Sequence, residues 1–168
     1  MGTHEKRGNN GPRAFGVTSE VKIIDRDLGW AAIKRMFQGE HEHYTDVGIM
    51  QEHDTRSDSA TNIELGFIHE FGAGKIPERS FLRSTINEKG AKYTPELDKI
   101  ATRSVMRKRF NIADLAALGK KAVADVQAKI MSNIPPPLAA ETVANKGHDL
   151  ALIDTRQMFE SIDHREDG

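Results

Sequence analysis

Apolar and polar positions divide the chain into short periodic segments separated by polar or glycine-bearing stretches. Residues 1–14 show no apolar periodicity and contain glycine, asparagine and proline, which predicts a flexible N-terminal arm. Apolar residues alternate over 15–23, which predicts a half-buried strand. A helix capped by Asp27 is predicted over 28–38, and a second strand over 44–50.

The segment after residue 60 combines a helix-start signal with four-residue spacing. Thr61 and Glu64 have the spacing of a capping box, in which each side chain accepts a backbone hydrogen bond of the first turn. Gly72 suits the end of such a helix. A strand is the rival interpretation, because apolar residues also alternate over 63–67. The apolar residues that recur every four positions are Ile63, Phe67 and Phe71.

Two helices are predicted in the middle of the chain. The first covers 77–89, because proline suits a first helical position and Phe81 begins an apolar face. Gly90 is expected to end it. A second helix is expected to restart at 94–96, where threonine, proline and glutamate follow one another.

The longest helix is predicted over 111–133, where apolar residues keep helical spacing. Three consecutive prolines at 135–137 break it, since proline has no backbone N–H to donate. The chain is expected to be irregular from there until Asp154 or Thr155 caps a last helix that runs through Ile162.

Together these elements predict an α+β fold. A small antiparallel sheet packs against several helices, including one long helix, behind the flexible N-terminal arm. The predicted organisation is the arm over 1–14, an α+β core domain over 15–134 and a C-terminal segment over 135–168. That last segment, broken by prolines and ending in a short helix, packs on the core or on a neighbouring copy.

The composition of the chain excludes several classes of protein function. The 168 residues suit one domain, and the lack of cysteine excludes disulfides, iron–sulfur clusters and thiol catalysis. No apolar run is long enough for a transmembrane helix, and the first residues lack the apolar stretch of a signal peptide, so no membrane partner is expected. A formal net charge of −1 argues against a dedicated nucleic-acid binder.

The near-neutral total hides an uneven distribution of charge. Residues 40–72 hold eight acidic side chains and one basic one, whereas residues 73–110 hold ten basic and four acidic ones. These blocks are either solvated faces or complementary surfaces through which copies of the chain meet.

Histidines near the acidic block raise one enzymatic alternative. His41, His43 and His69, with Glu70, are the candidate residues of a metal-dependent hydrolase. The stretch after His69 lacks the second histidine of a zinc-binding HExxH helix, and no serine stands in a nucleophile elbow. We therefore predict no catalytic activity and no cofactor, and keep the hydrolase and an adaptor domain with this α+β fold as alternatives.

Cations at helical spacing form two groups. Arg79 and Arg83 share one predicted helix face near Lys75, and Glu70 is the nearest acidic candidate to pair with either arginine. A second group repeats the four-residue spacing. Both groups are candidates for a subunit interface or for contacts with phosphates that pass through a pore, and the alternative is a solvated surface. The second group consists of Lys99, Arg103 and Arg107.

Two stretches taken in order resemble a known family. The first is IHEFG at 68–72 followed by IPERSFLR at 76–83. The second is PPL at 136–138, then Thr142, then KG at 146–147, then LIDTRQM at 152–158. This order resembles the virion-morphogenesis proteins of tailed bacteriophages, the neck and tail-completion proteins, over roughly residues 47–162. In that family glycine usually stands where this chain has Arg156, and another strand often follows the last helix. Because the sequence stops at Gly168, that strand is expected to be missing.

The resemblance implies a structural virion protein that forms a ring of six or twelve copies in the phage neck. Such a ring would join or complete the tail at the head–tail interface. Its partners would be further copies of itself, the connector or head-closure protein, and tail-terminator or tail-tube proteins. DNA would cross the lumen without sequence recognition. Phe81 would anchor its helix in the core while Arg79 and Arg83 face a neighbour or the lumen.

Overall fold

The computed structural model describes residues 29–38, 43–50 and 60–167, and these residues form the α+β fold that the sequence predicts. The predicted arm over 1–14 and the predicted strand over 15–23 lie outside the described residues. In chain order the elements are α1 (Trp30–Phe37), β1 (Tyr44–Ile49), α2 (Asn62–Phe71), α3 (Leu82–Arg107), α4 (Ile112–Met131), α5 (Ala140–Lys146), α6 (Gln157–Glu160) and β2 (Ile162–Asp167).

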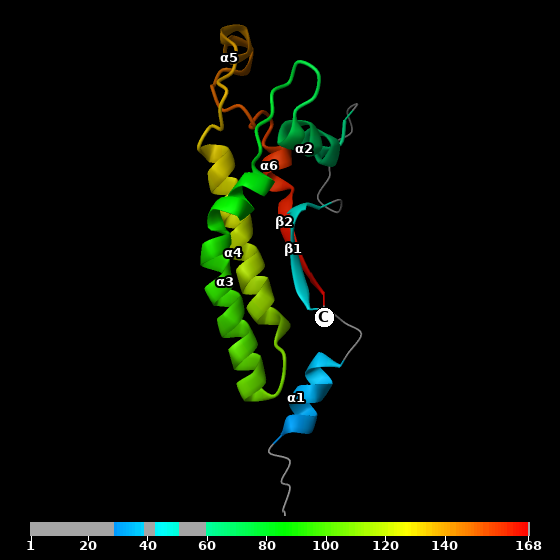
Figure 1. Ribbon diagram of the computed structural model, residues 1–168. Helices are drawn as coiled ribbons and strands as arrows, with labels where there is room; N and C mark the ends of the chain where they lie inside the picture. The colour runs from blue at the N-terminus through cyan, green and yellow to red at the C-terminus, as the bar shows by residue number, and fades with distance from the viewer. Residues whose placement is uncertain (1–28, 39–42, 51–59, 168) are drawn as a thin grey trace, which may run out of the picture.

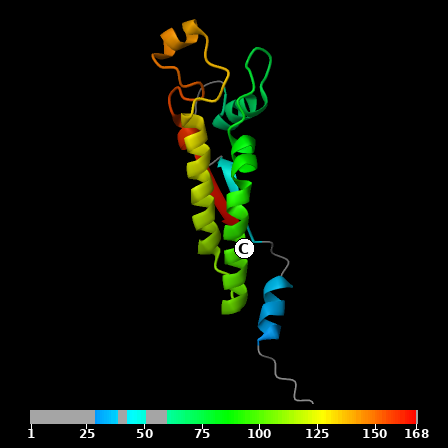
Figure 2. The same ribbon diagram turned by 60° about the vertical axis from the view of Figure 1, so that its left-hand side comes forward.

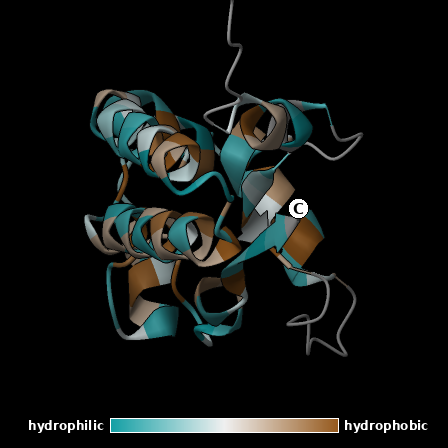
Figure 3. Ribbon diagram, turned by 90° about the horizontal axis from the view of Figure 1, so that it is seen from below, coloured by the Kyte–Doolittle hydropathy of each residue, from teal (hydrophilic) through white to brown (hydrophobic). Residues whose placement is uncertain are grey.

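Helices α3 and α4 form a long antiparallel hairpin that gives the molecule its elongated shape (Figure 1). Helix α4 packs on both strands and α3 packs on α4. In the turned view of Figure 2 the two strands are seen between α3 and α4. Viewed along the long axis, the helices carry both hydrophobic residues (brown) and hydrophilic residues (teal) (Figure 3). No helix in the described part of the chain has the length and apolar character needed to span a membrane.

The sheet pairs β1 with β2 in antiparallel register, from Tyr44 opposite Asp167 to Ile49 opposite Ile162. The predicted strand at 44–50 is therefore confirmed, but the prediction of a last helix through Ile162 is wrong, and so is the prediction that no strand follows it. Helix α6 ends at Glu160. Strand β2 reads IDHRED, so it lacks alternating apolar residues, and its extended conformation comes from hydrogen bonding to β1.

Buried apolar residues form two clusters along the hairpin. The first lies where α2, α6 and the start of α3 meet α4, and it includes Phe81, which has no exposed surface. Four of its members come from the C-terminal segment, which thereby packs on the rest of the chain: Leu152, Ile153, Met158 and Ile162. The second cluster joins α3 to α4 through Tyr93, Ile100, Leu115, Leu118 and Ala122.

The middle of the chain differs from its predicted helices. Residues 77–81 are not helical, and α3 runs unbroken from Leu82 past both Gly90 and Pro95. A proline inside a helix costs about 3 kcal/mol, because one backbone hydrogen bond is lost. Tyr93 and Ile100 flank Pro95 and pack against α4, and this contact keeps the helix continuous. Helix α3 is therefore longer than α4, at 26 against 20 residues.

Candidate functional site

Helix α2 buries a polar face and exposes an apolar one. The predicted capping box is present, since Glu64 N donates to Thr61 Oγ1 at 3.1 Å and Thr61 N donates to Glu64 Oε2 at 2.9 Å. The buried face consists of Asn62, Gly66 and Glu70. Glycine at 66 permits this packing, because a Cβ there would lie 2.2 Å from Ile49 Cδ1. The residues exposed on the other side are Ile63, Phe67 and Phe71, with Phe67 at 65%.

Glu70 caps the N-terminus of α3 from the neighbouring helix. Its Oε2 accepts hydrogen bonds from the backbone N–H groups of Phe81 and Leu82, at 2.8 and 2.9 Å. Its Oε1 accepts from the Arg83 N–H at 2.9 Å and from the Ser80 hydroxyl at 2.6 Å. The first N–H groups of a helix have no partner within the helix and carry partial positive charge, so a carboxylate satisfies both needs.

This set of donors stabilises the ionised form of Glu70. Burial by itself raises the pKa of the carboxyl group, because it disfavours charge. The hydrogen bonds from Ser80 and from the backbone N–H groups of Leu82, Arg83 and Phe81 outweigh burial and lower the pKa below its ordinary value of 4.5. Glu70 is therefore a structural anion at neutral pH, and it fixes the angle between α2 and α3.

Of the two arginines offered as partners of Glu70, Arg83 makes the ion pair. Arg83 Nε lies 3.5 Å from Glu70 Oε1, and Arg83 Nη2 donates to Glu78 Oε1 at 2.6 Å. The guanidinium also lies over the Phe71 ring, 4.9 Å from its centroid. Half of the Arg83 side chain stays exposed, so it can still contact another molecule from beside the apolar face of α2.

Arg79 does not face outward as predicted. It is 4% exposed, and its Nε and Nη2 donate to the carbonyl oxygen of Pro136 at 3.1 and 2.7 Å. Its backbone N–H donates to His69 O at 2.7 Å, which turns the chain back along the end of α2. Residues 77–81 thus form a connection outside any helix rather than the predicted helical turn, and this connection directs Arg79 toward the prolines.

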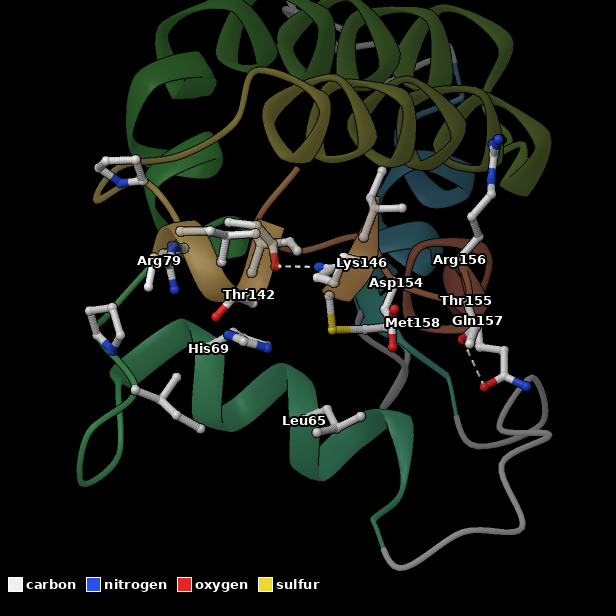
Figure 4. A pocket seen from close by; sticks show the side chains of 18 of the residues that line it. Leu65, His69, Arg79, Thr142, Lys146, Asp154, Thr155, Arg156, Gln157 and Met158 are labelled. Atoms are coloured by element: carbon white, nitrogen blue, oxygen red, sulfur yellow. Dashed lines mark hydrogen bonds between the residues drawn. The ribbon is translucent and has the colours of Figure 1, made fainter. Parts of the chain in front are cut away.

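A cavity of about 480 Å³ lies between the end of α2, the proline segment, α5 and the loop before α6. Figure 4 shows His69, Arg79, Thr142 and Lys146 around it, with the Thr142 hydroxyl directed toward His69. Lys146 Nζ donates to Leu150 O at 3.0 Å and to Ala151 O at 3.4 Å. The sequence interpretation missed this cavity, although many of its residues belong to the quoted PPL, Thr142, KG and LIDTRQM motifs.

The cavity has an electropositive interior. Burial lowers the pKa of His69, and the charges of Arg79 and Lys146 lower it further, so the imidazole is neutral near pH 7. Burial also lowers the pKa of Lys146, Asp154 opposes this, and Arg79 adds to it. His69 Nδ1 is buried and has no hydrogen-bond partner. Two cations thus lie close enough to influence each other, and Asp154 compensates them only in part.

The remaining predicted cations lie outside the interior of this cavity. Lys75 lies exposed at its rim. Lys99, Arg103 and Arg107 lie on the far half of α3, with Arg103 about 30 Å along the helix from Arg83 at 1.5 Å per residue. Arg103 is 3.5 Å from Asp114 of α4 and also donates to Lys99 O. The two groups of cations are therefore separate surfaces.

The ligand set of the hydrolase alternative is not brought together by the described residues. His43 stacks on Phe110 with 3.8 Å between ring centroids, whereas His69 lines the cavity. His41 lies outside the described residues. In the part of the chain that the structure describes, no group of three or more histidine and acidic side chains is arranged to hold a metal ion.

Arg156 occupies the position at which the resembled family usually shows glycine. Its φ is 65° and its ψ is −5°, a left-handed conformation that glycine adopts without steric cost. The tight turn therefore forms despite the larger side chain. The prediction of Asp154 or Thr155 as the helix cap is wrong, because Arg156 is the N-cap residue of α6.

Comparison with protein-family models, curated proteins and solved structures finds no match to this chain.

Proposed function

We propose that this chain is a structural subunit of a ring in the neck of a tailed bacteriophage. In this proposal six or twelve copies join or complete the tail at the head–tail interface and contact the connector or head-closure protein on one side. Tail-terminator or tail-tube proteins contact the other side. The ring encloses the passage for DNA, and the chain catalyses no reaction.

The observation that carries the proposal is that the ordered motifs meet in space. Glu70 of IHEFG caps the helix that begins within IPERSFLR. Arg79 of the same motif binds the carbonyl oxygen of Pro136 in PPL. KG and LIDTRQM line the cavity beside them. Motifs far apart in the sequence thus depend on one another, as expected if they are the signature of one fold rather than chance matches.

The surface of α2 supports a role in assembly. Its apolar face is exposed and lies next to the half-exposed Arg83. Apolar patches rimmed by charge often mark protein–protein contacts. Ring closure requires a different surface on the neighbouring copy, because contacts in a cyclic ring of more than two subunits are heterologous. The cations on α3 supply a second, separate surface, suited to an acidic neighbour or to the phosphates of DNA in the lumen.

The assembly test measures molar mass by light scattering across protein concentration and salt, with negative-stain images of the same samples. We expect species of six or twelve times the 18.7 kDa subunit mass, seen as rings. Phe67→Glu should shift the distribution toward monomer, because it buries a charge at the contact. Met131→Glu is the matched control, since Met131 is 49% exposed at the end of α4, outside both the α2 face and the α3 cations. A chain that is monomeric under all conditions, with or without the substitutions, would contradict self-assembly.

A further inference from the structure

The cavity beside α2 holds charge that the protein itself does not neutralise. Arg79 is nine-tenths or more buried, and its two hydrogen bonds both go to one backbone carbonyl oxygen. Among the described residues it has no ion pair with a carboxylate. A buried guanidinium normally has an anionic partner, because burial disfavours its charge. The Arg79 environment therefore points to an anion that comes from outside the chain.

Donors remain free around the cavity. A guanidinium has five N–H groups, and Arg79 uses two of them. An ammonium has three, and Lys146 uses two, on the carbonyls of Leu150 and Ala151. The buried Nδ1 of His69 also lacks a partner. These groups belong to α2, to the connection before α3 and to α5, so three separate elements direct donors toward one space.

The charges in the cavity favour an anion of a single charge. Arg79 and Lys146 carry one positive charge each, His69 is neutral, and Asp154 offsets one of the two cations. Lys75 and Arg156 are exposed at the rim, where solvent screens them. A carboxylate matches the residual charge, whereas a phosphate dianion exceeds it.

The walls of the cavity favour a hydrocarbon group attached to that carboxylate. Apolar side chains make up much of the lining. They come from α2, the connection before α3, the proline segment, the loop before α6 and α6 itself. Such walls stabilise a ligand by removing apolar surface from water. The apolar lining includes Leu65, Ile76, Pro77, Leu138, Ile153 and Met158.

We propose that this cavity binds a monocarboxylate on a short hydrocarbon stem. Arg79 and Lys146 hold the carboxylate, Thr142 and His69 complete its hydrogen bonds, and the apolar walls hold the stem. The ligand is either a small organic acid or the acidic side chain of another polypeptide. This inference does not depend on the proposed role in a phage neck, because the site is complete within one chain.

The test follows the His69 imidazole by NMR while butyrate is added to the full-length chain at constant ionic strength near pH 7. The His69 signal is assigned by its loss in His69→Gln. We expect a saturable shift, with binding about tenfold tighter than that of butyramide, which has the same stem without the charge. We also expect bound butyrate to raise the pKa of His69, because a carboxylate partly neutralises Arg79 and Lys146.

Variants of the cavity residues distinguish butyrate binding in the cavity from a nonspecific effect of the added salt. Lys146→Met should weaken butyrate about tenfold, since it removes a charge-assisted hydrogen bond. Lys75→Met, at the exposed rim, should change it less than about twofold. Thr142→Val provides a milder variant that leaves the Lys146 hydrogen bonds to the loop intact, with an expected weakening of about threefold. The amide spectrum of each variant reports whether it folds.

The two sources of the carboxylate are distinguished by capped tripeptides. Displacement of butyrate by Ac-Ala-Glu-Ala-NH₂, but not by Ac-Ala-Gln-Ala-NH₂, supports a polypeptide ligand. Binding of butyrate without displacement by either peptide supports a small organic acid. Inorganic phosphate that binds as tightly as butyrate would overturn the assignment to a carboxylate. A His69 signal that does not respond to butyrate in a saturable way would overturn the site itself.

Discussion

Replacing Glu70 with glutamine tests whether one carboxylate joins α2 to α3. The substitution keeps the size of the side chain and removes its charge. Both carboxylate oxygens of Glu70 accept two hydrogen bonds each, from the backbone N–H groups of Phe81, Leu82 and Arg83 and from the Ser80 hydroxyl. Glutamine has a single acceptor oxygen, so its amide NH₂ must face two of these donors.

The expected cost follows from these contacts. Hydrogen bonds to a charged group contribute roughly 1.5–3 kcal/mol each, and a buried donor left without a partner costs roughly 1–3 kcal/mol. Two such bonds are lost at a site whose side chain is 6% exposed, and part of the loss is recovered when the loop relaxes. We expect Glu70→Gln to lower the free energy of unfolding by about 3 kcal/mol.

The assay is urea denaturation followed by circular dichroism near neutral pH. Glu78→Gln is the matched control, because Glu78 also pairs with Arg83 but its side chain is 56% exposed. An exposed pair contributes less than about 1 kcal/mol, so this control should stay close to the wild type. If Glu70→Gln costs no more than Glu78→Gln, the carboxylate does not hold α3 and our account of this junction is wrong.

The free energy of unfolding of the wild type and of Glu70→Gln should also differ in how it depends on pH. The folded-state pKa of Glu70 is lowered below 4.5, so folding favours the ionised form. The stability that this provides is complete above the unfolded-state pKa and is lost as the pH falls through the folded-state pKa. The difference in unfolding free energy between the wild type and Glu70→Gln should therefore be constant near neutrality and shrink below pH 4.5.

Three further substitutions test other features of the fold, the first two by the same denaturation assay and the third by ultraviolet titration. Arg156→Gly should stabilise the chain by about 1 kcal/mol, because φ is 65° there and the side chain is 61% exposed; an unchanged or lowered stability would contradict this. Gly119→Ala should cost about 2 kcal/mol, since the added Cβ would lie 2.5 Å from His164 Cδ2, and full stability would show that α4 can shift. Burial and a 2.9 Å hydrogen bond to Asp125 raise the pKa of Tyr93 to about 12, so an ultraviolet titration should show a late-ionising phenol that Tyr93→Phe removes. That contribution to stability is complete below pH 10 and is lost as the pH rises toward 12.

Local signals in the sequence predicted the elements whose causes are local. The capping box at Thr61, the helix that follows it and the strand at 44–50 are confirmed, because neighbouring residues determine them. Elements that depend on distant partners were predicted wrongly. Helix α3 passes Pro95 because α4 supports it, and β2 is extended because β1 pairs with it. The six residues of β2, IDHRED, contain no pattern from which pairing with β1 could be predicted.

The residues of the candidate site also fall into those that local sequence signals predicted and those that depend on distant partners. The sequence offered Glu70 as a partner for either Arg79 or Arg83, and in the structure Arg83 is the one that pairs with it. It placed Arg79 on the surface, since spacing alone cannot show that the chain reverses at His69 and carries Arg79 to Pro136. His69 and Lys146 line one cavity only because the fold places α5 beside the end of α2, and no local pattern in the sequence shows this.

Helix α2 departs from the usual burial pattern of a helix, and we interpret this departure as a sign of function. Apolar residues normally face the core, yet this helix buries Glu70 and leaves Phe67 exposed. Burial of Glu70 is explained by the donors of α3, but nothing within the described chain requires two exposed phenylalanines on the opposite face. Because Phe67 is 65% and Phe71 51% exposed, leaving these surfaces in water forgoes about 1–2 kcal/mol of burial for each side chain. A contact made in assembly would recover that energy, which is why the α2 face, rather than the cations, is the first surface to disrupt.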